Sequence, residues 1–247
     1  MTTAPPSPAS TADTQGVWAD ILSQAVTGEL IGMQNYASMA GLLDADVQGQ
    51  IDAVEHANSE LGHAKTFRRA AQELGVAVIE DVTAPYWHRI REAFLRHVHA
   101  RDLTACLIVQ EIMLESFAVS MYHAVADVAD GKLAKTFRAI GDEEESHLEH
   151  AVTELQAARA ADPAGFEAKV GQLHEEVMTI LAEMVAARDT EGHCGLCHGD
   201  CVKSSLVLVG LSSSQLRGKA LAYYLKALDR IGIRGEESLR WVANLPV

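Results

Sequence analysis

The chain has 247 residues, of which 48% are hydrophobic and only 5% aromatic. This composition suits one well-buried domain and favours helices over an aromatic-rich β-sandwich. The 34 acidic and 20 basic residues give a formal net charge of −14, which argues against a nucleic-acid-binding surface. Because we find neither an export signal nor a run of eighteen apolar residues, we expect a cytoplasmic protein without a transmembrane segment.

The N-terminal segment and the first helix pair come first in the chain. Residues 1–16 are rich in Pro, Ser, Thr and Ala, which predicts a flexible tail, and residues 17–247 are expected to form a single domain. Helical periodicity runs from about residue 17 to 43 and again over 46–74, where Gly75 is a stop signal. A short turn therefore joins two antiparallel helices.

A second pair of long helices follows. A short helix over about residues 85–99 leads into a very apolar helix that ends near Val128. The Asp130-Gly131 step breaks that helix, and the next one is expected over 133–160. The sequence thus predicts an all-α fold with a four-helix bundle at its centre.

The C-terminal third contains shorter elements. Pro163 suits the start of a helix that continues to about residue 188. The segment 189–214 then loses the helical pattern and contains three of the four cysteines, so we interpret it as a Cys-containing insertion. Two last helices are expected over about 215–231 and 236–244.

Two of the predicted long helices carry a Glu-x-x-His pair. Glu60 precedes His63, and Glu144 precedes His147, by three residues, and no other histidine of the eleven has a glutamate at that distance. Residues three apart lie on one helix face, so both side chains of a pair can reach one metal ion. The two pairs are 84 residues apart, which indicates two similar helix pairs.

A lone glutamate precedes each pair by about thirty residues, and these two, Glu29 and Glu115, lie 86 residues apart in apolar stretches. One interpretation is ordinary surface glutamates with chance histidines. The other is a two-metal centre in a ferritin-like bundle, where two helices supply one Glu each and two supply Glu-x-x-His. Burying a carboxylate is costly unless a cation or strong donor neutralises it, which favours the metal centre. Oxygen and imidazole ligands suit iron or manganese.

At these residues the sequence resembles the cyanobacterial aldehyde-deformylating oxygenases, also called long-chain fatty aldehyde decarbonylases, which are ferritin-like di-iron proteins. The similarity covers most of the chain. It is carried by residues 28–36, 60–67, 115–123, 142–148 and 224–243.

The resemblance implies a set of roles. It implies a di-iron enzyme that uses O2 and electrons from ferredoxin or a similar donor to convert a fatty or other apolar aldehyde into formate and an alkane one carbon shorter. Tyr122 would be a hydrogen-bonding neighbour of the metal site. Two alternatives stay open: a di-iron oxygenase acting on another substrate such as an amine, and a non-catalytic protein that handles iron or redox signals. The iron ligands would be Glu29, Glu60, His63, Glu115, Glu144 and His147.

Small residues near the lone glutamates allow two interpretations. Val26, Gly28, Gly32 and Ala118 either leave room for an alkyl chain beside the metals or serve helix packing. One departure from the resembled family lies at Glu143, where that family tends to have Asp, and we expect this change to alter a hydrogen bond to a ligand.

The cysteines of the insertion form a second chemical feature. Cys194 and Cys197 form a Cys-x-x-Cys pair, and Cys201 with His193 or His198 completes a Cys3His set typical of structural zinc. An iron–sulfur centre, redox-active thiols that feed electrons to the di-iron site, and unligated thiols are the alternatives. The resembled enzymes have no counterpart of this cluster.

Overall fold

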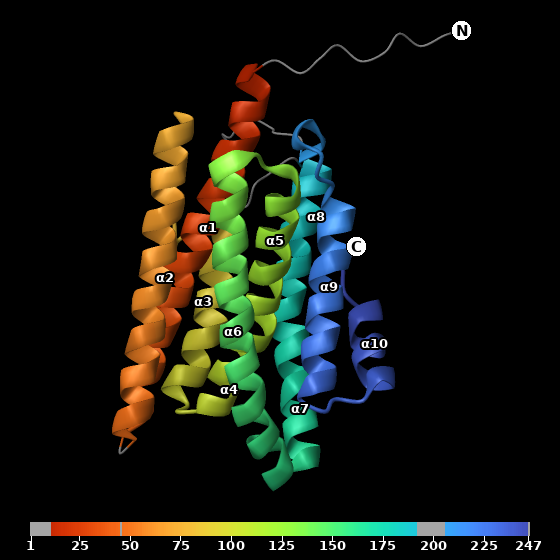
Figure 1. Cartoon of the computed structure of the whole chain (residues 1–247). Coiled ribbons are helices and arrows are strands. Elements are labelled where there is room, and N and C mark those ends of the chain that lie inside the picture. Colours follow the sequence, from red (N-terminus) through yellow and green to blue (C-terminus); the bar gives the residue numbers. More distant parts are fainter. Residues whose placement is uncertain (1–10, 45, 192–205, 247) are drawn as a thin grey trace, which may run out of the picture.

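The computed structural model describes residues 11–44, 46–191 and 206–246, and all regular structure in these ranges is helical. Figure 1 shows long helices that lie side by side along one axis. The α-helices are α1 (Thr11–Ala40), α2 (Val47–Leu74), α3 (Pro85–His99), α4 (Leu103–Leu107), α5 (Glu115–Val128), α6 (Gly131–Ala161), α7 (Pro163–Leu173), α8 (Thr179–Glu191), α9 (Ser213–Arg230) and α10 (Gly235–Ala243).

Two antiparallel helix pairs form the bundle. Helix α1 packs along α2, and α5 packs along α6, while α9 covers α5 from the other side. The turn into α2 is fixed by Asp46, whose carboxylate accepts a hydrogen bond from the Gly49 amide, and α2 ends at Gly75 in a left-handed conformation (φ 69°) that favours glycine. The predicted pairing of helices is therefore present.

Helix α1 begins earlier than predicted. Residues 11–16, which we assigned to the flexible tail, are helical, and α1 ends at Ala40 rather than near residue 43. Residues 1–10 lie outside the described part of the chain. The Ser, Thr and Pro content of the N-terminus thus led us to place the helix start six residues too late.

Two π-helical segments interrupt the helices, at Ile108–Leu114 (η1) and His174–Met178 (η2), and a short 3-10 helix forms at Leu206–Val209 (η3). Segments α4, η1 and α5 form one continuous helix over Leu103–Val128, whose most apolar window has a mean hydropathy of 1.5. By length and composition this helix is a candidate membrane span, although 72% of the window is buried inside the bundle. Such burial is typical of the core helix of a soluble protein.

A polar layer divides the hydrophobic core into two clusters. On α1, Val26 belongs to one cluster and Ile31 to the other, with Glu29 between them. Helix α6 repeats the pattern, since Ile140 and Leu148 belong to different clusters. Apolar packing above and below therefore holds the layer of carboxylates in place.

Candidate metal centre

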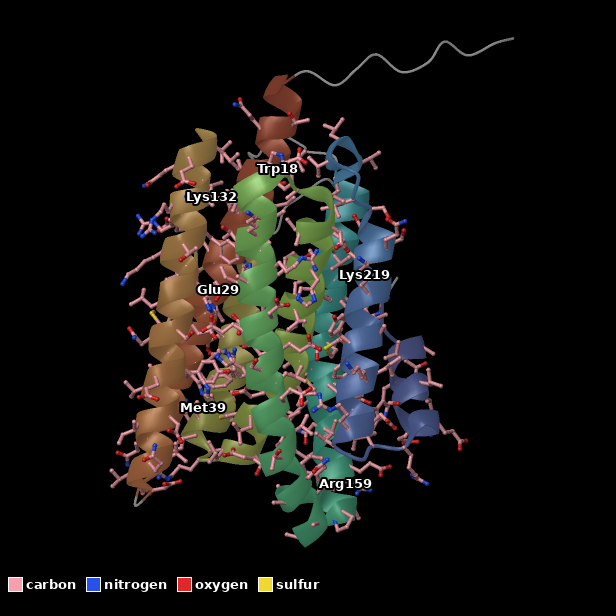
Figure 2. All side chains as sticks on the ribbon, in the orientation of Figure 1. Trp18, Glu29, Met39, Lys132, Arg159 and Lys219 are labelled. Atoms are coloured by element: carbon pink, nitrogen blue, oxygen red, sulfur yellow. The ribbon has the colours of Figure 1, made fainter. Side chains whose placement is uncertain are left out.

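The six predicted metal ligands come together in this polar layer. Four helical segments, α1, α2, the start of α5 and α6, supply them, and Figure 2 shows Glu29 about midway along the bundle. Glutamates 29, 60, 115 and 144 are each at most 3% exposed, His63 is 6% exposed, and the side chain of His147 is 11% exposed. Glutamates on the surface would be solvated, so the surface interpretation is wrong for this set.

Glu144 joins the two histidines. Its Oε1 atom lies 2.7 Å from His63 Nδ1, and its Oε2 atom lies 2.9 Å from His147 Nδ1. His63 Nδ1 also lies 3.2 Å from Glu29 Oε2. Ligand atoms of Glu29, Glu60, His63 and Glu144 all lie within 4.8 Å of one another, a spacing that one ion could bridge.

The other two predicted ligands lie beside this group. His147 Nδ1 is 3.8 Å from Glu60 Oε1, so it reaches the group from its own side of the layer. Glu115 Oε1 accepts a hydrogen bond of 2.7 Å from the Gln110 side-chain amide. The structure therefore brings four predicted ligands into one compact group and places the remaining two at its edge.

A chain of buried amides supports Glu115. Asn35 Nδ2 donates to Gln110 Oε1 at 2.6 Å, and Arg91 Nη1 donates to Asn35 Oδ1 at 2.7 Å. Both amides are at most 2% exposed. Each group in this chain donates toward Glu115, so the positive charge of Arg91 is coupled through two oriented amides to a buried carboxylate.

Two neighbours hold the ligands of the first helix pair. The Tyr122 hydroxyl donates a hydrogen bond to Glu29 Oε1, and burial raises the pKa of Tyr122 well above its ordinary value. Gly32 leaves space for Glu60, because a Cβ atom at this position would lie 2.8 Å from Glu60 Oε2. Tyr122 thus stays protonated and acts as a donor.

The ring of His63 is held from outside the layer as well. Its Nε2 atom lies 3.2 Å from Glu143 Oε2, and Glu143 Oε1 accepts a 2.7 Å hydrogen bond from Ser59. A carboxylate near the distal nitrogen favours the ring orientation in which Nδ1 faces the centre. Glu143 therefore reaches His63, although its side chain is longer than that of the Asp expected at this position.

Burial and mutual repulsion make three of the four carboxylates hard to ionise, whereas hydrogen bonds to His147 and His63 outweigh burial and lower the pKa of Glu144. Burial, followed by the charge of Glu144, raises the pKa of Glu29 and, further, that of Glu60 and Glu115. The pKa of His63 is raised to about 11 although burial alone would lower it, because contacts to Glu144 and Glu29 outweigh the loss of solvation. Protons therefore balance the negative charge in the metal-free protein.

These residues fit a pair of divalent metal ions. Glu60 Oε1 is buried and has no hydrogen-bond partner in the described part of the chain, which leaves a lone pair directed into the layer. Four carboxylates and two imidazoles are the ligands that iron and manganese accept. A cation here would neutralise the charge that burial makes costly.

An apolar cavity of about 130 Å³ reaches the centre. Glu29, Glu60 and Glu115 form its polar end together with Tyr122. The predicted small residues Gly28, Gly32 and Ala118 line it, whereas Val26 packs in the core. The cavity supports the first interpretation for those three residues, which is space beside the metals. Other apolar lining comes from Ala25, Met121, Leu206 and Leu211.

The proposed second metal site is at residues 193–201. These residues lie outside the described part of the chain, so zinc or an iron–sulfur centre at His193, Cys194, Cys197, His198 and Cys201 stays a prediction. The remaining cysteine, Cys106, is buried in the core, and burial raises the pKa of its thiol to about 12.

A family model described as long-chain fatty aldehyde decarbonylase matches residues 13–192, which is most of the chain. The chain belongs to this family. The match confirms the resemblance that the Glu-x-x-His segments indicated. It ends at residue 192, so it does not include the cysteine cluster, whose interpretation as an insertion stays a prediction.

Among solved structures, the chain is similar to a protein from Synechococcus described as having aldehyde deformylating oxidase activity. The two share 20% sequence identity with a TM-score of 0.74, and the alignment covers 95% of this chain and 97% of the other. At this identity the likeness shows the fold, and it confirms the predicted all-α bundle.

The sequence interpretation missed the residues behind the ligands. Gln110 and Glu111 are polar residues in the most apolar predicted helix, and Asn35 lies six residues after Glu29. A polar residue in an otherwise apolar helix was the available signal for the first two. Nothing local to Arg91, on the amphipathic α3, distinguishes it from a surface arginine.

Proposed function

We propose that this chain is an O2-dependent di-iron oxygenase that deformylates an apolar aldehyde. The carbonyl carbon would leave as formate, and the remaining chain would gain a hydrogen to become an alkane one carbon shorter. One observation carries the proposal: a buried Glu/His cluster able to hold metal lies at the end of an apolar cavity, in a member of the aldehyde decarbonylase family.

Six side chains would hold the iron. Glu144 contacts both histidines, so we assign it as the carboxylate shared between the two ions, and each histidine would bind through Nδ1. The bound iron would supply O2 activation and Lewis acidity toward the aldehyde oxygen. The full proposed set is Glu29, Glu60, His63, Glu115, Glu144 and His147.

Neighbouring residues would position the ligands and the substrate. Tyr122 would keep Glu29 oriented by donating its hydroxyl proton, and it also forms part of the cavity wall. The apolar lining would bind the alkyl chain and exclude water from the reacting carbon. Small residues at Gly28 and Ala118 leave the space that the chain needs next to the carboxylates.

Three further parts belong to the same proposal: iron rather than manganese as the metal in cells, a ferredoxin or similar protein as electron donor, and a cytoplasmic location. The cysteine cluster would bind zinc or an iron–sulfur centre. The electron requirement follows from the overall balance. Conversion of an aldehyde and water into an alkane and formate releases no electrons, so the donor must supply all the electrons that reduce O2.

The deciding experiment supplies iron-loaded protein with a long-chain aldehyde, O2 and a ferredoxin reducing system, and measures formate and hydrocarbon. We expect equal amounts of formate and of the alkane one carbon shorter. The Glu144→Ala variant should produce neither, whereas Glu55→Ala, which removes an exposed carboxylate from α2, should match the unmodified protein.

A different outcome would redirect the assignment. Consumption of O2 with the aldehyde intact across chain lengths, under a reducing system shown to work, would contradict deformylation. Product formation from amines would then indicate an oxygenase of another substrate class. O2 consumption without any organic product would favour a protein that handles iron or redox signals.

A further inference from the structure

A further buried carboxylate, Glu111, lies next to the proposed metal centre and has no assigned role. It belongs to the π-helical segment η1, four residues before Glu115, and is only 3% exposed. Its Oε2 atom is buried and has no hydrogen-bond partner in the described ranges. π-Helical turns inside α-helices often occur at functional sites.

Glu111 lies on the side of the layer that His147 occupies. Interaction with the Tyr36 side chain and then the charge of His147 lower the pKa of Glu111, and the charge of Glu111 in turn raises the pKa of His147, so Glu111 lies near both groups. Burial is the larger influence and raises the pKa of Glu111 to about 8. The charge of Glu144 acts in the same direction.

Rings extend the His147 side of the layer. The His147 ring lies 4.7 Å from the His56 ring, centroid to centroid, and His56 lies 5.0 Å from Tyr36. Among the charges that raise the pKa of the buried Tyr36 hydroxyl, that of Glu111 is the largest. Glu111 therefore lies near both Tyr36 and His147.

No equivalent carboxylate exists in the first helix pair. The residue four positions before Glu29 is Ala25, which is buried and lines the apolar cavity. Glu111 thus adds a negative charge only on the His147 side, next to four buried carboxylates. An additional buried anion is destabilising unless a proton or a cation neutralises it.

We propose that Glu111 is a further ligand of the metal centre and binds the ion held by His147. The inference rests on the proposed di-metal site and adds a seventh side chain to it. A third carboxylate on one side would make the two metal positions unequal, with tighter binding at the position next to His147. The Oε2 atom of Glu111, which has no hydrogen-bond partner in the described ranges, and the imidazole of His147 supply two donor atoms for that ion.

The test is an anaerobic titration of the metal-free protein with Co²⁺, followed by visible absorption and by competition with a chelator. The Glu111→Gln substitution keeps the shape of the side chain and removes its charge. We expect at least about a tenfold loss of affinity for one of the two ions, with a changed cobalt spectrum. Wild-type affinity and spectrum for both ions would overturn the proposal.

Two further variants complete the test. Glu154→Gln is the matched control, because Glu154 is exposed on α6 and also contributes to the field at Glu111, so binding should not change. Glu111→Asp retains the charge on a shorter side chain. We expect it to bind more tightly than Glu111→Gln, and equal binding by the two would contradict ligation even if Glu111→Gln folds poorly.

The failure of this inference can be told apart from failure of the proposed function. If His147→Ala loses cobalt while Glu111→Gln keeps both ions, Glu111 is a neutral carboxyl with a structural role and the di-metal assignment stands. If His147→Ala also binds both ions like the unmodified protein, the proposed ligand set itself is wrong.

Discussion

The two helix pairs supply the same kinds of proposed ligand but differ in how they hold them. Helix α1 continues as a regular α-helix through Glu29, whereas the π-helical segment η1 immediately precedes Glu115. The first pair has an alanine four residues before its lone glutamate, and the second has Glu111. A repeated ligand pattern in the sequence therefore leads to two unequal halves of one centre.

Each helix pair also supports the lone glutamate of the other. Tyr122 of α5 donates to Glu29 of α1, and Asn35 of α1 supports Glu115 through Gln110. These contacts join segments more than seventy residues apart in the sequence. The position of the centre thus depends on correct packing of the two pairs against each other.

Loss of a ligand should have the largest effect. Replacing Glu115 or His147 by Ala removes one donor from the second helix pair, and we expect either variant to lose di-iron binding. Iron per chain, measured by elemental analysis after anaerobic loading, tests this. Glu145→Ala, on the same helix as His147, is the control. Near-normal iron content in Glu115→Ala or His147→Ala would refute the assignment of that residue.

Crowding the first helix pair should have the next largest effect. In Gly32→Ala the added methyl group would lie 2.8 Å from Glu60 Oε2 and 3.4 Å from the Gln110 amide nitrogen, so Glu60 must move. We expect a folded protein with weakened iron binding. Gly62→Ala has no atom within 4 Å of the added methyl and should instead stabilise α2 by about 0.5–1 kcal/mol.

Chemical denaturation and iron titration of the two glycine variants distinguish these expectations. If both variants bind iron equally well, the close approach of Gly32 to Glu60 is not needed by the centre. If both are destabilised, helix packing rather than the ligand limits these positions.

Removing the hydrogen bonds that support Glu115 or Glu29 compares how much metal affinity depends on each half of the centre. Gln110→Leu leaves Glu115 without its donor and Asn35 without its acceptor, while Tyr122→Phe removes only the donor to Glu29. Loss of such hydrogen-bond partners typically reduces metal affinity by roughly 10–100-fold. We expect the larger loss in Gln110→Leu, because two buried groups lose partners. A competition titration with a chelator ranks the variants, and the reverse order would show that Glu29 is the more dependent ligand.

Local patterns in the sequence were sufficient to predict the long helices and the Glu and His side chains that gather in the polar layer. The Glu-x-x-His spacing follows from one helix turn, and the lone glutamates stand out because apolar residues surround them. The amide chain from Arg91 could not be predicted, since it joins α3, α1 and η1 through contacts that only the packed bundle creates. The π-helical segment was missed for a related reason, because its residues fit an ordinary apolar helix.

The pH dependence of stability in the metal-free protein should show the smallest effect. Glu111 has an ordinary pKa of 4.5, and burial raises its pKa to about 8 in the folded protein. Because the folded state binds the proton more tightly, its stabilising contribution is complete below 4.5 and is lost as the pH rises to about 8. Denaturation midpoints measured over this range should therefore decrease with increasing pH. Glu111→Gln cannot ionise, so its midpoint should decrease less, and identical slopes for the two proteins would mean that Glu111 does not change its ionisation on folding.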